Sequence, residues 1–114
     1  MIEVTKERLR QLPKAELHVH LDGSVRPETM IELARAYGKT LPEWEPEALR
    51  DYMHVKDARD LVDYLARFDI TLSVMQTAEA LERIAYELVE DLAGENVRYV
   101  EVRYSPVLNT CEGL

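Results

Sequence analysis

Four polar side chains alternate with apolar ones in one short stretch of the sequence. The stretch ELHVHLDG, residues 16–23, places Glu16, His18, His20 and Asp22 two residues apart. Side chains of an extended strand alternate between its two faces, so these four project from one side. Two imidazoles on adjacent pleats can converge on one metal ion, and a catalytic zinc site needs such nitrogen ligands plus an open position for water. The spacing therefore predicts that His18 and His20 bind a metal.

A solvated edge strand is the alternative interpretation of this pattern. An antiparallel strand with one face in water also alternates polar and apolar residues, and an H-x-H spacing alone matches many unrelated sequences. A parallel strand covered by helices would instead bury its polar face, where the side chains need a metal or other partners to offset desolvation. The surrounding elements decide between the two interpretations.

The first of these elements have clear start and stop signals. Residues 5–12 have the pattern of a short amphipathic helix, which Pro13 stops, and residues 15–21 have the alternation of a strand. Pro27 is placed to open a helix, and Gly38 is placed to cap its C-terminus.

The later segments predict more helices and a second strand. They are a short helix over 46–53, a longer helix N-capped by Asp57, a helix from Thr77 to Gly94, and a strand over 97–105. A strand, helices and a second strand form a βαβ-type layout, which implies parallel strands with helices against the sheet. We therefore predict an α/β fold, with residues 1–114 forming one incomplete domain, because the chain stops shortly after its second strand.

Composition restricts the partners and the location. The net charge is −8 and the isoelectric point about 4.9, so nucleic acid and anionic membranes are poor partners. No apolar run is long enough for a signal peptide or a membrane span, and we expect a soluble, cytoplasmic protein. Cys111 is the only cysteine, which excludes an internal disulfide and leaves histidines and carboxylates as the metal ligands.

Longer stretches of the chain match a family. The segment LPKAELHVHLDGSVRPETMIELA, residues 12–34, closely resembles the opening of adenosine deaminases in the amidohydrolase superfamily. The resemblance continues through Asp69, RIAYE at 83–87 and YVEVRYSP at 99–106, so it covers essentially the whole chain. The H-x-E and P-C-x-x-C pattern of cytidine-type deaminases is absent. The resemblance implies the N-terminal part of a (β/α)₈ TIM-type barrel, with extra helices between strands one and two.

The resemblance also implies roles for the residues of the first strand. His18 and His20 would bind one Zn²⁺ per active site, and His20 would also contact the substrate. Asp22 would help to hold the ribose of a purine nucleoside, although an aspartate before Gly23 also suits a simple turn. Gly23 would be the turn that lets the substrate approach closely.

The helix after Asp57 has two interpretations. By resemblance, Leu61, Tyr64 and Leu65 belong to a lid that lines the purine pocket, although relatives often have Phe where this chain has Tyr64. The same spacing, continued to Phe68, is that of any packed helix, and it favours a plain core stripe.

Other polar residues have less specific signals. On the second strand, Arg103 is hypothesised to pair with Glu101 or Glu16 beneath the metal site. His54 follows a predicted helix and is interpreted as a surface residue. Ser105 is interpreted as a strand-end cap, since no histidine neighbours it in the sequence.

The function implied by the resemblance is zinc-dependent hydrolysis of adenosine or deoxyadenosine to inosine or deoxyinosine and ammonia. Free adenine, or a modified adenosine such as aminofutalosine, is the alternative substrate. The family's other zinc ligands and its proton donor lie on later strands, so we expect these 114 residues alone to be inactive. A stand-alone metal-binding module, or a subunit completed by another chain, is also compatible with the sequence.

Overall fold

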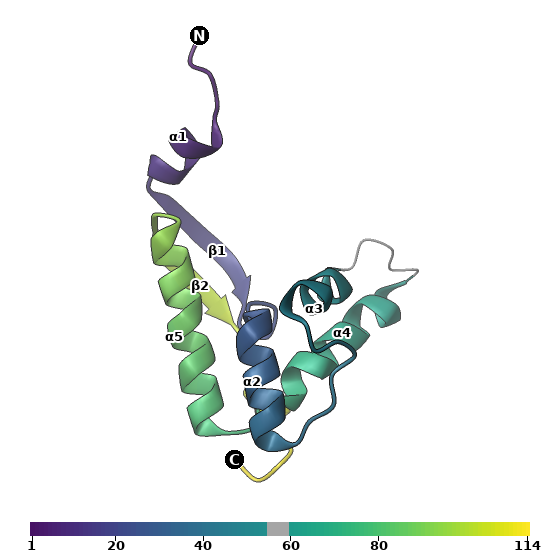
Figure 1. Cartoon of the computed structure of the whole chain (residues 1–114). Helices are drawn as coiled ribbons and strands as arrows, with labels where there is room; N and C mark the ends of the chain where they lie inside the picture. Colours follow the sequence, from purple (N-terminus) through teal and green to yellow (C-terminus); the bar gives the residue numbers. More distant parts are fainter. Residues whose placement is uncertain (55–59) are drawn as a thin grey trace.

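The computed structural model describes residues 1–54 and 60–114, which form an α/β arrangement around two strands (Figure 1). Helix α1 (Lys6–Gln11) leads into β1 (Lys14–His20). The helices α2 (Pro27–Tyr37), α3 (Pro46–Met53), α4 (Leu61–Ser73) and α5 (Ala78–Gly94) come before β2 (Val97–Arg103) and a 3₁₀ helix, η1 (Pro106–Asn109). In Figure 1, α2 and α5 lie near the strands, whereas α3 and α4 lie together on the side of α2 away from α5. The predicted order of elements is confirmed.

The two strands are parallel, with β1 beside β2 as its one neighbour among the described residues. Glu16 is paired with Val100 and His20 with Arg103. Between these pairs β1 has one residue more than β2, which makes a bulge just before the end of the strand. The parallel pairing excludes the antiparallel edge strand as an interpretation of the polar alternation.

Local chemistry explains where the helices begin and end. Pro27 occupies the first turn of α2, and Gly38 ends this helix in the left-handed region at φ 65°, with its N–H donating to the Ala34 carbonyl. Thr77 caps α5 by accepting a hydrogen bond from the Ala80 N–H at 3.1 Å. The expected N-cap of α4, Asp57, lies outside the described residues. Asp60 is the N-cap residue of this helix, and its Oδ1 accepts a hydrogen bond from the Asp63 N–H at 2.9 Å.

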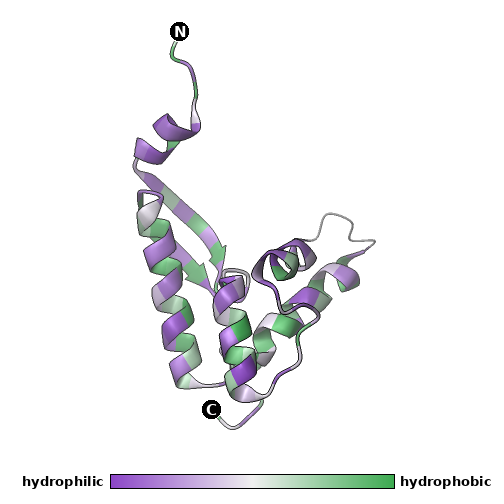
Figure 2. Ribbon diagram, viewed as in Figure 1, coloured by the Kyte–Doolittle hydropathy of each residue, from purple (hydrophilic) through white to green (hydrophobic). Residues whose placement is uncertain are grey.

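The hydrophobic core lies mainly between the helices and beneath the end of β1. Figure 2 shows that α2 and α5 carry both hydrophobic and hydrophilic residues around their circumference, as amphipathic helices do. Leu21, just after β1, is buried, Val19 is half-buried, and Leu17 is 59% exposed. The helices therefore cover only the C-terminal part of the apolar face of β1. The buried apolar residues are Leu21, Met30, Ile31, Leu33, Ala34, Leu41, Leu49, Val74, Met75, Ala80, Ile84 and Leu88.

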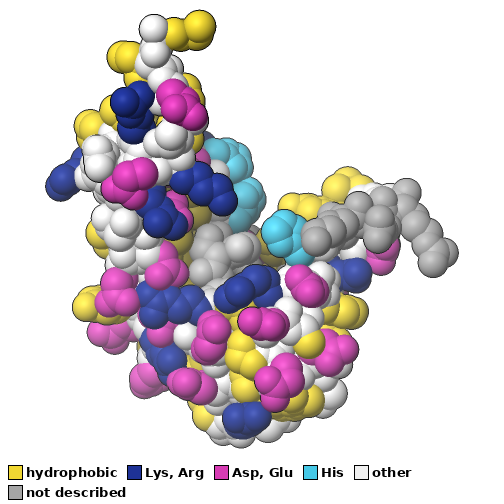
Figure 3. Space-filling model, turned by 45° about the horizontal axis from the view of Figure 1, so that its top comes forward, with side chains coloured by type: hydrophobic (Ala, Val, Ile, Leu, Met, Phe, Trp, Pro, Cys, Tyr) yellow, Lys and Arg dark blue, Asp and Glu magenta, His cyan; other side chains and the backbone are white. Residues whose placement is uncertain are grey.

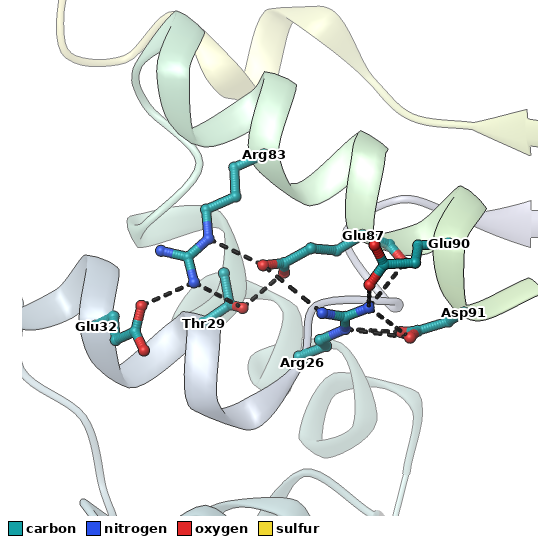
Figure 4. A network of polar contacts seen from close by, with 7 residues as sticks. All are labelled: Arg26, Thr29, Glu32, Arg83, Glu87, Glu90 and Asp91. Atoms are coloured by element: carbon teal, nitrogen blue, oxygen red, sulfur yellow. Dashed lines mark hydrogen bonds and ion pairs between the residues drawn. The ribbon is translucent and has the colours of Figure 1, made fainter. Parts of the chain in front are cut away.

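Helices α2 and α5 are also joined by the Arg26–Glu87 network, which comprises Arg26, Thr29, Glu32, Arg83, Glu87, Glu90 and Asp91 (Figure 4). The Glu87 carboxylate is buried and accepts hydrogen bonds from Thr29 Oγ1 at 2.6 Å and Arg83 Nε at 2.9 Å. These bonds offset the cost of removing a carboxylate from water.

Arg26 is the polar anchor at the N-terminal end of α2. Its guanidinium donates to both carboxylate oxygens of Asp91, at 2.7 to 3.2 Å, and to Glu90 Oε1 at 2.8 Å. Hydrogen bonds to Asp91 and Glu90 raise the pKa of Arg26 above its ordinary value. Because Arg26 is the N-cap residue of α2, these contacts fix the place where the chain leaves the 21–25 loop and enters the helix.

Among the described residues, no helix is both long enough and apolar enough to cross a membrane.

Candidate metal and substrate site

The two histidines of β1 converge, as their spacing predicts. Nε2 of His18 and Nε2 of His20 are 3.0 Å apart, and the ring centroids are separated by 4.9 Å. Two nitrogens bound to one tetrahedral zinc ion, each about 2.0–2.1 Å from the metal, lie about 3.3 Å apart. The pair therefore fits two ligand positions of a single ion.

A tight turn after His20 brings a carboxylate close to this pair. The Gly23 N–H donates to the His20 carbonyl at 3.2 Å, and Ser24 Oγ donates to the same carbonyl at 2.6 Å. This turn places Asp22 Oδ1 at 3.8 Å from His20 Nδ1. The aspartate thus serves the turn and also faces the histidine, so the two sequence interpretations of this residue are compatible.

Asp22 Oδ1 is the atom that most clearly indicates a ligand. It is buried and has no hydrogen-bond partner among the described residues. A buried acceptor without a donor costs about 1–3 kcal/mol, so a hydroxyl or amine of a bound molecule would stabilise it. Asp22 Oδ1 and the Nε2 atoms of His18 and His20 are the protein atoms that are available here to bind a metal and its substrate. No cluster of three or more metal-binding side chains occurs in the part of the chain that the structure describes, so further ligands would have to come from elsewhere.

A cavity of about 440 Å³ opens next to Asp22, between α2, α3 and α4. We call it the α2–α4 cavity. Asp22 and Gly23 form its border, and Tyr64 also lines it, whereas Leu61 and Leu65 do not. Its apolar wall consists of Val25, Pro27, Met30, Leu49, Met53 and Phe68.

The core-stripe interpretation of α4 is wrong for its first turns. Leu61, Tyr64 and Leu65 are 67%, 44% and 49% exposed, whereas Phe68 is half-buried. The Phe68 ring lies 5.7 Å from the Tyr64 ring and 6.5 Å from the His20 ring. Phe68 thus brings the middle of α4 next to His20, while the first turns of the helix are exposed.

The ion pair predicted beneath the histidines is not formed. Among the described residues Arg103 has no carboxylate partner, and its side chain is exposed, while Glu101 accepts a hydrogen bond from Tyr99 at 2.9 Å. Sequence spacing placed the charges on one strand face correctly. However, spacing could not show that Glu101 would accept a hydrogen bond from Tyr99 and would not pair with Arg103.

Four polar residues of the cavity were not predicted as site residues. Arg50, His54 and Arg67 line it together with Thr71, which is buried. His54 is exposed, as predicted, yet it belongs to the cavity lining because α3 ends there. Figure 3 shows histidine side chains gathered near one notch in this face of the molecule. Only the approach of α3 to α4 could reveal this group, and that packing has no local sequence signal.

A comparison with known protein families identifies the chain. The sequence profile described as adenosine deaminase matches residues 13–114. The chain belongs to the adenosine deaminase family. The resemblance inferred from the ELHVHLDG and YVEVRYSP segments is therefore confirmed.

Individual relatives agree with this assignment. An adenosine deaminase from Vibrio atlanticus is 52% identical over 103 residues, which are 90% of this chain and 31% of that protein. The solved adenine deaminase from Arthrobacter aurescens is 30% identical, with a TM-score of 0.75 over 90% of this chain and 30% of that one. A solved amidohydrolase from Burkholderia ambifaria with bound zinc is 29% identical, with a TM-score of 0.71 over 96% and 30%. The chain thus spans about a third of the length of these adenosine deaminase relatives.

Proposed function

We propose that the enzyme to which these residues belong deaminates adenosine or deoxyadenosine hydrolytically, with zinc at the His18–His20 pair. The observation that carries this proposal is the convergence of the two Nε2 atoms, 3.0 Å apart, beside the unpartnered Asp22 Oδ1. Two neutral nitrogen donors suit zinc, and a buried acceptor next to them suits a polar substrate. Membership of the adenosine deaminase family supports the reaction class.

The proposed setting is a (β/α)₈ barrel. Barrels of this type carry their active site at the C-terminal ends of the strands. His20 is the last residue of β1, and Asp22 follows in the next turn, so both lie at that end of the parallel pair. The zinc-bearing relative supports the choice of metal.

Each residue of the candidate site has a separate role in the proposed reaction. Zinc, when bound, supplies an activated water at neutral pH. His18 and His20 hold the metal through Nε2. Asp22 accepts a hydrogen bond from a sugar hydroxyl and orients the nucleoside. Tyr64, with Phe68 behind it, covers the base and excludes water.

Adenosine is the preferred substrate because the unpartnered Asp22 oxygen needs a donor at a distance from the reacting ring. A sugar hydroxyl supplies it, and free adenine has no sugar. Adenine remains the second candidate, since one solved relative is named an adenine deaminase. A modified adenosine is the third candidate, and it would use Asp22 in the same way.

The test is an assay of enzyme expressed from the complete coding region that contains these residues. We expect conversion of adenosine to inosine and ammonia, loss of turnover with a zinc chelator, and recovery with added zinc. His18→Ala should abolish turnover and remove the zinc, whereas the matched change His54→Ala should leave the zinc bound, because His54 is exposed at the end of α3 and is not one of the converging pair. Turnover that survives both chelation and His18→Ala would contradict the proposal.

A subunit completed by another chain is the second candidate arrangement. It is favoured by the single neighbour of each strand among the described residues. A partner that co-purifies with the 114-residue chain and restores adenosine turnover would establish it. A single long polypeptide that carries all the activity would exclude it.

A further inference from the structure

We propose that Ser24 is a positioning residue for the substrate. Its hydroxyl holds the 21–25 loop against the end of β1 and so keeps the Asp22 carboxylate beside His20. The inference rests on the proposed function and adds to it a residue that has no assigned contact with the metal or the nucleoside. Because Ser24 acts through Asp22, its hydroxyl should matter for nucleoside binding and not for zinc binding.

The loop that carries Asp22 is fixed on both sides. Before Asp22, Leu21 is 5% exposed, and its N–H donates to the Arg103 carbonyl of β2 at 2.9 Å. At the other side, the Arg26 guanidinium donates to carboxylates of α5 at 2.7 and 2.8 Å (Figure 4). Residues 22–25 connect these fixed points. The position of Asp22 therefore depends on contacts made within this short connection.

Hydrogen bonds from the loop return to the end of β1. Ser24 Oγ donates to the His20 carbonyl at 2.6 Å, and the Gly23 N–H donates to the same carbonyl at 3.2 Å. The Ser24 N–H donates to the Leu21 carbonyl at 3.1 Å. The bond from the hydroxyl is the shortest of these, and the other two come from the backbone. The Ser24 side chain is therefore the part of this contact that the residue type determines.

The Asp22 carboxylate needs to be held in place by its surroundings. Oδ1 is buried, has no hydrogen-bond partner among the described residues and lies 3.8 Å from His20 Nδ1. A buried acceptor without a donor would be stabilised by turning toward water. Gly23 follows directly and has no side chain to restrict such a rotation. The Ser24 bond opposes the rotation, so that the carboxylate keeps its place beside His20.

A purely structural role is the alternative, and Ser73 provides the matched control for it. Ser73 Oγ donates to the Ile70 carbonyl, also at 2.6 Å, and both serines are half-buried. The two hydroxyls thus make the same kind of bond in different places. If such a bond only stabilises the fold, the two alanine variants should have the same kinetics.

The first experiment compares Ser24→Ala, Ser24→Thr and Ser73→Ala in enzyme from the complete coding region. We expect Ser24→Ala to raise KM for adenosine by about three- to tenfold, the effect of losing one hydrogen bond, with kcat within about twofold. Its zinc content should not change. Ser24→Thr keeps the hydroxyl and should restore most of the loss in KM. Ser73→Ala should leave KM as it is in the unchanged enzyme.

A double variant tests whether Ser24 acts through Asp22. In the Asp22→Asn background, adding Ser24→Ala should raise KM by less than about twofold, because the charged acceptor that Ser24 holds in place is already lost. The dissociation constant of inosine, measured by isothermal titration calorimetry, gives the same comparison without turnover. An equal effect of Ser24→Ala in both backgrounds would show that the serine does not act through Asp22.

The outcomes separate the inference from the proposed function. If adenosine is turned over and Ser24→Ala has the same KM as Ser73→Ala, the inference is wrong and the proposed function stands. Loss of zinc in Ser24→Ala would also overturn the inference, because the serine would then act on the metal ligand. If circular dichroism shows that Ser24→Ala does not fold, Ser24→Cys, with its weak donor, replaces it. If the unchanged enzyme neither turns over adenosine nor binds inosine, the proposed function fails, and the inference fails with it.

Discussion

Thr29 Oγ1 donates a 2.6 Å hydrogen bond to Oε2 of the buried Glu87. This bond connects the segment that follows the metal-binding strand to the RIAYE segment in α5, 58 residues later in the chain. Neither segment holds a candidate metal ligand. Both segments belong to the stretches that resemble adenosine deaminases. Their contact holds α2 against α5 and so fixes the end of the 21–25 loop.

Thr29→Val tests this connection. The variant keeps the shape of the side chain and removes one donor from a buried carboxylate, so we expect the free energy of unfolding to fall by about 1–3 kcal/mol. Denaturant titration monitored by circular dichroism measures the change. Thr40→Val, at an exposed position, is the control and should cost less than about 0.5 kcal/mol. Equal effects of the two variants would contradict the role of the hydrogen bond.

Zinc content is the direct measure of the histidine pair. In enzyme from the complete coding region, His18→Ala and His20→Ala should each lose most of the bound zinc, and His54→Ala should retain it. Metal analysis by mass spectrometry after gel filtration gives the stoichiometry. Full occupancy in His18→Ala would show that the pair is not the metal site.

Asp22→Asn separates substrate binding from metal binding. Asparagine keeps an acceptor oxygen but loses the charge, and a hydrogen bond to a charged acceptor is stronger by about 1 kcal/mol. We therefore expect KM for adenosine to rise by about five- to tenfold, with little change in kcat and none in zinc content. Steady-state kinetics and metal analysis on the same sample test both parts. An unchanged KM would mean that Asp22 serves only the turn.

Leu65→Ala and Leu49→Ala distinguish a lid from a core. Leu49 is fully buried, so its truncation should cost about 2–5 kcal/mol of stability. Leu65 is 49% exposed, and its truncation should change stability by less than about 0.5 kcal/mol. If α4 is a lid, Leu65→Ala should nevertheless raise KM. A large loss of stability in Leu65→Ala, with kinetics unaltered, would restore the core-stripe interpretation.

The sequence predicted the elements well because their boundaries are local. Pro27, Gly38 and Thr77 each define a helix end through backbone geometry or a short hydrogen bond, and all three were identified correctly. The convergence of His18 and His20 was predicted for the same reason, since the period of a strand places both side chains on one face.

Features that depend on packing between distant segments were not predicted. The Arg26–Glu87 network joins residues that are about 60 positions apart, and no periodicity indicates which charges will meet. The contribution of His54 to the cavity depends on how α3 approaches α4. The same limit explains the wrong pairing of Arg103, since a strand pattern gives the face of a side chain and not its neighbour.

The core-stripe interpretation of α4 was wrong for a different reason. Apolar residues at helical spacing show which side of a helix is apolar, but not what covers that side. In this chain the apolar residues at this spacing become more buried along α4, from Leu61 and Leu65 to Phe68 and Leu72. Spacing alone gives both halves of the helix the same pattern.

The pairing of β1 with β2 alone also affects how the chain behaves in solution. Among the described residues, the outer edge of each strand has no further strand beside it, and such edges form hydrogen bonds readily with other molecules. A sample of only these 114 residues should therefore self-associate as it is concentrated, despite the mutual repulsion expected from a charge of −8. Light scattering across a dilution series would reveal growing particles, and short β-forming peptides would compete with that growth.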